Sequence, residues 1–319
     1  RLPLKDSGLV RIKLVICPNN KFNQLAYLLE LLDDARNDIF LMIDEKSDLQ
    51  PDKIKLLRNS VIKAHLYFSD RINIYWGGYS QIKAEMCLFQ LARKTGHYVY
   101  YHLISGVDLP LHSQEYIHNF FDQHPDKIFL TMTSNLAFKR SKIMNRVIYN
   151  YYFIKYSAHS LPNFKYGKLF RLLEKINLGI QMITGLGAMR RKKLPEVYYA
   201  SNWLSLDEGS VDFLLSNELK IKRIFRHAFL CDELFVPTVL FSDSRFKDKL
   251  YWDEPVHDIP NEPQGNLRYI NWWDGSPYVW QDKDISSLKE AASMGHLFAR
   301  KFDLEQTPKL KLAIKKMCS

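Results

Sequence analysis

The chain alternates between short, continuously apolar runs and longer segments in which apolar residues recur every three or four positions. The first pattern is typical of buried strands and the second of amphipathic helices. The apolar runs predict strands over residues 9–18, 38–44, 72–76, 98–105 and 127–131. The helical spacing predicts helices over residues 23–36, 51–62, 80–94 and 113–124. This alternation predicts an α/β fold with a mostly parallel central sheet, right-handed crossovers and flanking helices.

The pattern loosens after residue 131. A basic helical segment is expected over residues 168–184 and is followed by a glycine turn. The remaining predictions are a strand running into a helix over 203–217, a strand and loop leading into a short helix over 223–240, a strand within 267–277 and a helix over 285–294. The chain contains no internal repeat and no low-complexity segment.

Polar or glycine-containing clusters follow three of the predicted strands. In chain order these clusters are Asp44; Trp76, Gly77 and Gly78; and Ser105, Gly106 and Asp108. Glycine and aspartate also follow strands for backbone reasons alone. Ligands of open parallel sheets, however, bind beyond the carboxyl ends of the strands. Three such clusters at one edge therefore favour a binding cleft.

Positive charge is concentrated in one part of the chain. The formal net charge is +10, and residues 132–200 contain thirteen lysines and arginines but only two acidic residues, Glu174 and Glu196. The same stretch is rich in tyrosine and phenylalanine. It could bind an acidic acceptor, an anionic membrane surface or nucleic acid, or it could simply be a basic surface that aids solubility.

Several function classes are disfavoured by missing motifs. The chain has no GxGxxG and no GxxxxGK[ST], which argues against a dehydrogenase or a P-loop kinase. Its four cysteines are scattered without paired spacing, and its histidines form no HxH or HxxxH. The only DxD, Asp282 and Asp284, precedes a helix, where capping explains Asp284, so no metal site is expected.

No apolar run is long enough to span a bilayer and the first residues are not a signal peptide, so we expect a cytoplasmic protein.

The sequence CDELF places Asp232 and Glu233 at the start of a predicted helix. Acids are ordinary at this position, because they complement the helix dipole. The alternative is a general base, since the neighbouring apolar residues would partly desolvate a carboxylate and raise its pKa. Pro237 removes an amide donor, so the helix is expected to be distorted near these acids.

Arg300 and Lys301 stand side by side in HLFARKFD, between Phe298 and Phe302. A solvated face would accommodate them, but the bulky neighbours favour a half-buried segment. Buried cations require an anionic partner.

Four tryptophans offer flat faces on which a base or sugar could stack, although a core position is commoner for tryptophan. They are Trp76, Trp203, Trp272 and Trp273, and Asp274 follows the last of them.

Six motifs, taken in order, resemble those of one known family. They are WGGYS (76–80), YYHLISGVDLPLHSQEYI (100–117), NWLSL (202–206), CDELFVPTVL (231–240), LRYINWWDGSP (267–277) and LFARKFD (297–303). Over about residues 11–303 the chain resembles the core-2/I-branching β-N-acetylglucosaminyltransferases, which share glycosyltransferase family 14 with the peptide xylosyltransferases. The absence of an anchor and of paired cysteines looks like a bacterial relative.

The resemblance implies a GT-A-like fold and an inverting, metal-independent transfer of a sugar from a UDP-sugar, forming a β-linkage. It implies that Glu233 is the catalytic base, with Asp232 orienting it, and that Arg300 and Lys301 hold the diphosphate. The three clusters at the strand ends would line the nucleotide and donor pocket, and Trp203, Trp272, Trp273 and Asp274 would bind the acceptor. Two fixed cations can neutralise the charge that develops as UDP departs.

One catalytic domain over residues 1–319 is expected on this basis. It would comprise a nucleotide-binding half (about 1–131), a basic, aromatic insert (132–200) and an acceptor and catalytic half (201–319). N-acetylglucosamine is the expected donor sugar, with xylose or glucose as alternatives. The expected acceptor is a glycan or a lipid-linked glycan, reached through peripheral contact with an anionic inner-membrane face.

Two other readings stay open at this point. A metal-dependent transferase could use Asp108 or the pair Asp282 and Asp284. A basic nucleic-acid-binding module is permitted by the charge and the tyrosines, but it lacks any helix-turn-helix, RNP or zinc signature, so no nucleic-acid partner is expected.

Overall fold

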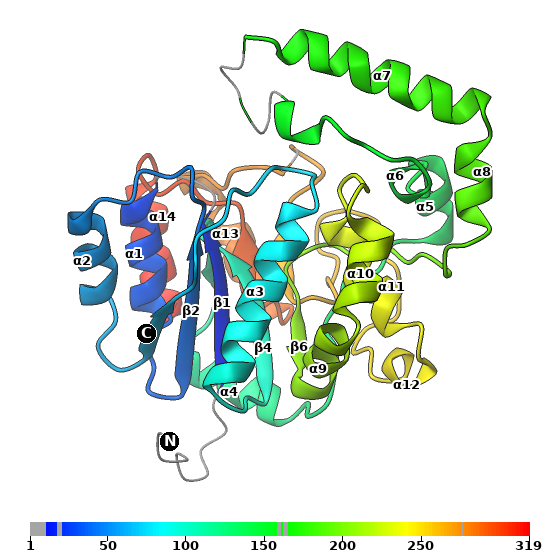
Figure 1. The fold of residues 1–319 in the computed structure, drawn as a ribbon. Coiled ribbons are helices and arrows are strands. Elements are labelled where there is room, and N and C mark those ends of the chain that lie inside the picture. Colours follow the sequence, from blue (N-terminus) through cyan, green and yellow to red (C-terminus); the bar gives the residue numbers. More distant parts are fainter. Residues whose placement is uncertain (1–10, 18–20, 158–160, 162–164, 276) are drawn as a thin grey trace.

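The structure is a computed structural model that describes residues 11–17, 21–157, 161, 165–275 and 277–319. Five strands of the described residues form the central sheet in the order β3-β2-β1-β4-β6. Their bounds are β1 Arg11–Cys17, β2 Asn37–Ile43, β3 His65–Phe68, β4 Tyr100–Ser105 and β6 Ser205–Asp207. The first four are parallel and β6 runs antiparallel to β4. The mostly parallel sheet predicted from the sequence is therefore confirmed (Figure 1).

Helices cover both faces of this sheet because its strands are apolar on both sides. Alternate residues of β2 enter two cores: Phe40 and Met42 join one, and Ile39, Leu41 and Ile43 join the other. The first core is closed by α3 Ser80–Thr95, α9 Glu208–Ser216, α10 Glu218–Phe225, α11 Asp232–Leu240 and the short α12 Ser244–Lys247. The second is closed by α1 Phe22–Leu31, α2 Pro51–Asn59, α4 Gln114–Asp122, α13 Ile285–Ser293 and α14 Pro308–Met317.

A second, smaller sheet brings the C-terminal part of the chain back to the end of β4. Its order is β5-β8-β7, from β5 Asp108–Pro110, β8 Phe298–Arg300 and β7 Arg268–Ile270. β5 is antiparallel to β8, and their register pairs Asp108 with Arg300. Phe298 and Phe302 are fully buried. The half-buried character predicted for HLFARKFD is thus confirmed, and the segment pairs with β5 on one side and β7 on the other.

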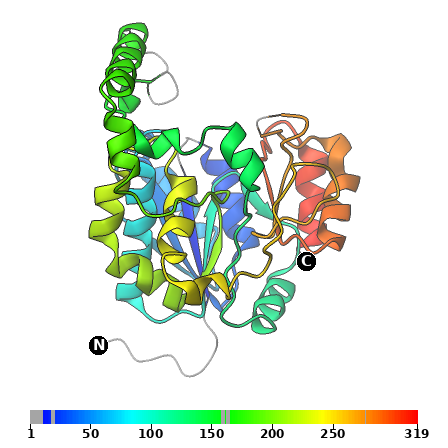
Figure 2. The ribbon, with the colours of Figure 1, turned by 90° about the vertical axis from the view of Figure 1, so that its right-hand side faces the viewer.

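The basic stretch forms an arm that projects from the body (Figures 1 and 2). It contains α5 Asn135–Arg140, α6 Asn145–Ile148, a 3-10 turn over Ile154–Tyr156, α7 Gly167–Ile183 and α8 Leu186–Arg191. The predicted glycine turn shrinks to Gly185, which has a φ of +69° between α7 and α8. Among the described residues, no helix combines the length and apolar composition that crossing a bilayer requires.

Some predicted elements are wrong. The strand predicted over residues 72–76 is absent from the described chain: this segment is a loop in which the Ile72 carbonyl accepts from the Glu45 backbone N–H, just after β2. His65–Phe68 takes the strand position beside β2 instead. Residues 127–131 make only isolated bridges, at Ile128 and Phe129. The strand expected at residue 223 is the last turn of α10, and α14 was not anticipated. The three segments wrongly predicted as strands are short, and a short apolar run does not by itself distinguish a strand from a buried loop or helix turn.

Candidate functional site

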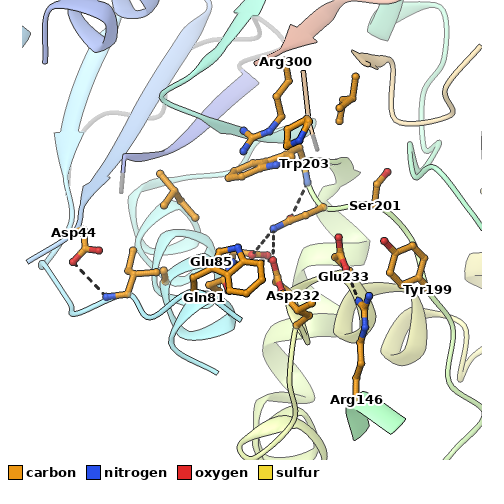
Figure 3. A pocket seen from close by; sticks show the side chains of 18 of the residues that line it. Asp44, Gln81, Glu85, Arg146, Tyr199, Ser201, Trp203, Asp232, Glu233 and Arg300 are labelled. Carbon is orange, nitrogen blue, oxygen red and sulfur yellow. Dashed lines mark hydrogen bonds and ion pairs between the residues drawn. The ribbon is translucent and has the colours of Figure 1, made fainter. Parts of the chain in front are cut away.

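A pocket of about 630 Å³ opens beyond the carboxyl ends of β1 and β2 (Figure 3). Seven of the residues singled out from the sequence line it: Asp44, Trp76, Trp203, Asp232, Glu233, Trp272 and Arg300. They come from six separate stretches of the chain. In Figure 3 Arg300 enters from one side of the pocket and Glu233 from the opposite side. The cleft predicted at this sheet edge therefore exists, and it contains both the acidic and the cationic candidate.

Glu233 lies in the first turn of α11, and the predicted effect of Pro237 is visible there. Proline has no amide hydrogen, so the carbonyl of Glu233 lacks its usual helical partner. The backbone N–H of Ala200 donates to that carbonyl at 3.0 Å. This bond holds the segment that follows Ala200 against the start of α11. Proline therefore does more than distort the helix, because it frees the acceptor that docks a second wall of the pocket.

Two side chains surround the Glu233 carboxylate. Arg146 Nη1 lies 2.7 Å from Glu233 Oε2, and the Arg146 guanidinium lies over the ring of Tyr199. Burial raises the pKa of Glu233, while the Arg146 charge and hydrogen bonds from Arg146 and Tyr199 act to lower it. Burial, and then the nearby Glu233, raise the pKa of Tyr199. Glu233 is thus an oriented, partly desolvated carboxylate, which suits a general base.

A second pair of carboxyls lies behind Glu233. Asp232 Oδ2 accepts hydrogen bonds from Gln81 Nε2 at 2.9 Å and from Asn202 Nδ2 at 3.0 Å. Asn202 Nδ2 also lies 3.4 Å from Oε1 of the buried Glu85. Burial, and then the nearby Glu233, raise the pKa of Asp232 to about 7. Burial, and then the nearby Asp232, raise the pKa of Glu85 well above its ordinary value.

Gln81 and Asn202 connect this carboxyl pair to the rest of the pocket wall. Gln81 Oε1 accepts from the backbone N–H of Gly77, and Asn202 Oδ1 accepts from the backbone N–H of Trp203 at 2.8 Å. Trp203 has a φ of +69°, so this side-chain bond holds it in a left-handed backbone conformation. The two amides therefore tie the WGGYS turn and the NWLSL segment to the acids of CDELF.

Arg300 is held in place by Ser105 and Asp108, which flank the turn between β4 and β5. Its Nη1 lies 2.7 Å from Oδ1 of the buried Asp108 and also donates to Ser105 Oγ. Asp108 in turn accepts from the Ser105 backbone N–H at 2.9 Å. The guanidinium lies 4.8 Å from the ring centroid of Trp203. Arg300 is thus a fixed cation with one edge bound to the protein. Ser105 and Asp108 bind its guanidinium on the side away from the pocket and do not themselves line the pocket.

The first two polar clusters predicted at the strand ends, Asp44 and Trp76 to Gly78, differ in how they contribute to the pocket. Asp44 is buried, accepts from Lys46 Nζ at 2.7 Å and bonds the backbone of Lys46 and Ile74, so it joins the loop after β2 to the loop before α3. Trp76 is 44% exposed at the pocket mouth. Gly77 has a φ of +74°, and a Cβ there would lie 2.7 Å from the ring of Phe229. Gly78 completes the turn into α3.

Like Gly77, Gly78, Ser105 and Asp108, the remaining four predicted site residues lie away from the pocket lining: Gly106, Lys301, Trp273 and Asp274. Gly106 is buried, and its backbone N–H donates to the carbonyl of Ile16. Lys301 is half-buried behind Arg300; burial, and then Arg300 and Lys21, lower its pKa. Trp273 packs against Tyr269 in the second core. Asp274 accepts from Asn271 Nδ2 at 3.0 Å.

Sequence reasoning missed five polar residues that surround the acids of the site: Gln81, Glu85, Arg146, Tyr199 and Asn202. Arg146 belongs to the basic stretch, and nothing in its local sequence sets it apart from the twelve other cations there. Glu85 had a detectable signal, because it lies on the same face of α3 as Ile82, Leu88 and Phe89, which are three and four positions away and buried. A charged residue at a core position of a helix indicates either an error in the assignment or a buried functional group.

The residues considered for a metal occupy structural positions. Asp284 accepts from the Gln281 backbone N–H and from the Tyr278 hydroxyl, and Asp282 accepts from the Leu310 backbone N–H at 2.7 Å. The prediction that Asp284 caps the helix after it is wrong, because its side chain bonds none of the first amides of α13. Asp284 instead completes a capping box with Gln281 at the 3-10 turn Asp282–Asp284. Neither aspartate lines the pocket. Within the described ranges, no group of three or more histidine, cysteine or acidic side chains is arranged to hold a metal ion.

Solved structures similar to this chain include three glycosyltransferases of low sequence identity. Mouse xyloside xylosyltransferase 1 is 11% identical (TM-score 0.32; 74% of this chain and 83% of that one covered). The WbbM bifunctional glycosyltransferase is 11% identical (TM-score 0.45), and the match covers 99% of this chain but about half, 52%, of that one. Core-mannan synthase A of Aspergillus fumigatus, solved with manganese and GDP, is 10% identical (TM-score 0.35; coverage 74% and 71%).

The family comparison is more decisive. No curated protein matches the chain. A sequence model of the core-2/I-branching enzymes, however, matches residues 14–294, a range that includes every pocket-lining residue named above except Arg300. The chain therefore belongs to the core-2/I-branching enzyme family of glycosyltransferases, with the α/β, GT-A-like fold that its motifs predicted.

Proposed function

We propose that the protein transfers a sugar from a UDP-sugar to a hydroxyl of a glycan or lipid-linked glycan, with inversion, forming a β-linkage. N-acetylglucosamine is the proposed donor sugar, with xylose or glucose as alternatives. The observation that carries the proposal is the pocket with Glu233 at one wall and Arg300 at the other. An inverting displacement needs a base and a charge stabiliser on opposite sides of the reacting carbon.

The proposed reaction is a single displacement. The acceptor hydroxyl attacks the anomeric carbon of the donor, and its proton passes to the Glu233 carboxylate. The bond from the anomeric carbon to the β-phosphate oxygen breaks, and UDP leaves with the electron pair of that bond. Arg146 supports this role of Glu233, because its guanidinium fixes one carboxylate oxygen. Asp232 holds the start of α11 through Gln81 and Asn202 and so orients Glu233.

Protein cations are proposed to take the place of a divalent metal at the diphosphate. Arg300 is held by Asp108 on one side and faces the pocket with the rest of its fork, which suits phosphate oxygens. Burial, and then the charges of Arg300 and Lys21, lower the pKa of the half-buried Lys301. A bound diphosphate would relieve that repulsion. Trp76, Gly77, Gly78 and Asp44 would form the nucleotide side, and Trp203 and Trp272 would contact the sugars.

The proposed division of the chain follows from these roles. Residues 1–131 would hold the nucleotide, and residues 201–319 would supply the base, the diphosphate cations and most of the acceptor contacts. The basic insert, residues 132–200, would receive the acceptor; Arg146 and Tyr199 are its contributions to the pocket. Trp273 and Asp274 are proposed to act indirectly, by supporting the loop that presents Trp272.

The first test is a calorimetric titration of purified protein with UDP, UDP-N-acetylglucosamine, UDP-xylose and UDP-glucose, in EDTA and again with manganese. Binding in EDTA, tightest for one UDP-sugar, is expected. Lys301→Ala should weaken UDP binding about tenfold or more, because it removes one of the two positive charges proposed to hold the diphosphate. The exposed Lys289→Ala on α13 is the matched control and should bind UDP normally. Binding that requires manganese would contradict the proposed use of Arg300 and Lys301.

The second test separates binding from transfer. Glu233→Gln should retain binding of the UDP-sugar and lose about 10²–10⁴-fold in transfer rate, because glutamine is similar in shape but cannot accept the proton. Both quantities are measured on the same preparation, by calorimetry and by release of UDP in the presence of an acceptor. Normal transfer by Glu233→Gln would show that another group is the base.

A further inference from the structure

Helix α7 of the projecting arm packs with its polar face inward. Glu174 Oε2 accepts from the Phe153 backbone N–H at 2.7 Å, and Asn177 Nδ2 donates to the Asn150 carbonyl at 2.8 Å. Gln181 Oε1 accepts from the Asn150 backbone N–H, also at 2.8 Å. These three residues are spaced three and four positions apart, so they lie on one face of the helix. That face binds the loop ahead of α7.

The opposite face of α7 is aliphatic and exposed. Its residues are Leu169, Leu172, Ile176, Ile180 and Ile183, which recur every three or four positions. The first four are 49–54% exposed and Ile183 is 89% exposed. An amphipathic helix on a globular body normally has the reverse orientation, with its apolar side buried. A contiguous exposed stripe of this kind marks a surface that contacts something else.

Cations flank this aliphatic stripe. Lys168 and Lys175 are seven residues apart and lie on one edge of it, and both are exposed. A second group of exposed cations, Arg191, Lys192 and Lys193, follows at the end of α8. Glu174 is the only acidic residue from Met132 to Pro195, and it is turned inward. The outer surface of α7 therefore combines aliphatic side chains with positive charge.

We propose that the aliphatic face of α7 docks on an anionic lipid bilayer. Helices with an apolar face and a basic edge lie in the plane of the bilayer interface, with the apolar side chains among the acyl chains and the cations near the headgroups. The charge distribution favours this occupant over a second copy of the chain. Pairing two α7 stripes would bring two sets of cations together with no acid on the outer face to offset them.

The docked orientation would also connect the bilayer with the pocket. An apolar groove of about 350 Å³ lies at the inner side of the arm, lined among others by Phe170 of α7 and by Tyr151, Phe153 and Phe229. Trp76 lines both this groove and the main pocket. A lipid-linked acceptor held at the bilayer would then have an apolar path that ends beside Glu233. This step rests on the proposed function, whereas bilayer docking by itself does not.

The test is co-sedimentation of the whole protein with vesicles, without donor or acceptor. Vesicles of phosphatidylcholine and phosphatidylglycerol (2:1) are expected to bind at least tenfold more tightly than phosphatidylcholine alone. The triple variant Leu172→Gln/Ile176→Gln/Ile180→Gln should reduce this affinity tenfold or more. Lys168→Gln/Lys175→Gln should reduce it severalfold and weaken its dependence on salt.

A matched control changes three exposed aliphatic residues elsewhere: Ile62→Gln/Leu219→Gln/Leu312→Gln. It should bind vesicles like the wild type, and all variants should keep their melting temperature and UDP binding. Failure of the wild type to bind anionic vesicles, or equal loss in the control, would overturn the proposal. A dimeric wild type together with a monomeric triple variant would also overturn it, because the aliphatic face of α7 would then be a contact between two copies of the chain. Normal vesicle binding without glycosyl transfer would overturn only the proposed function.

Discussion

At the scale of single residues, three carboxyl groups of the site differ in which protonation state their surroundings favour. Glu233 faces Arg146 and Tyr199, which favour its ionised form. Asp232 and Glu85 lie deeper, and neither Asp232 Oδ1 nor Glu85 Oε2 has a hydrogen-bond partner among the described residues. Burial favours the protonated form of both, and so does a neighbouring carboxylate, Glu233 for Asp232 and Asp232 for Glu85. The carboxyl nearest the pocket is therefore the one that is poised to accept a proton.

Arg146→Gln is expected to shift the pH dependence of transfer. The Arg146 charge lowers the pKa of Glu233, so its removal raises that pKa. Because the base acts only when ionised, the acidic limb of the kcat/KM profile should move to higher pH, by about one unit or more. Profiles between pH 5 and 9 measure the shift.

The control for this change is Arg140→Gln, an exposed cation of the same basic stretch. It should leave the acidic limb where it is in the wild type. If the limb of Arg146→Gln also stays in place, the group that titrates in the profile is not Glu233.

At the scale of elements, the pocket depends on short connections rather than on the strands themselves. The Gly77 turn between the sheet and α3 accepts from the Leu230 backbone N–H at 2.8 Å and donates to Gln81, so it is bound to both sides of the site. Pro237 has a similar effect in α11, because it leaves the Glu233 carbonyl free to bind Ala200. Both devices bring segments that are far apart in sequence to one pocket wall.

Gly77→Ala should destabilise the protein by about 1–3 kcal/mol, since the added Cβ combines a positive φ with a clash against Phe229. It should also weaken UDP-sugar binding, because Trp76 is its neighbour. Gly179→Ala is the paired change: it lies within α7 with no atom near the new Cβ, and should be neutral or stabilise by about 0.5–1 kcal/mol. Urea unfolding gives both values. Equal effects of the two changes would mean that the Gly77 turn is not constrained.

At the scale of the whole molecule, the buried carboxyl pair links α3 to α11 and so contributes to the pH dependence of folding. The pKa of Glu85 is raised in the folded state, so the folded protein binds a proton that the unfolded chain releases. The free energy of unfolding therefore falls as the pH rises from about 4.5 through the folded-state pKa. This pH dependence affects the stability of the whole fold, because α3 and α11 pack in the same core.

Glu85→Gln should remove this loss. Relative to the wild type, its free energy of unfolding should increase by about 1 kcal/mol or more between pH 5 and pH 8, one pKa unit being about 1.4 kcal/mol. Urea unfolding at the two pH values measures the difference. The exposed Glu30→Gln on α1 is the control, and its difference from the wild type should not change with pH. A constant difference for Glu85→Gln as well would mean that Glu85 is ionised in the folded protein.

The sequence by itself determined the α/β class, most of the long helices and strands, and seven of the residues that line the pocket. These follow from local signals: buried strands are continuously apolar, helices repeat every three or four residues, and the six motifs are read along the chain. Asp232 and Glu233 are adjacent in sequence, so their shared position needed no tertiary information.

Tertiary structure alone decided how those residues are paired. Arg146 meets Glu233 across 87 positions, and Arg300 meets Asp108 across 192. It also decided that Trp273 turns to the core while Trp272 turns to the pocket, and that α7 presents its aliphatic side outward. Local spacing shows that a helix has an apolar face, but which face is covered depends on what the rest of the chain packs against it.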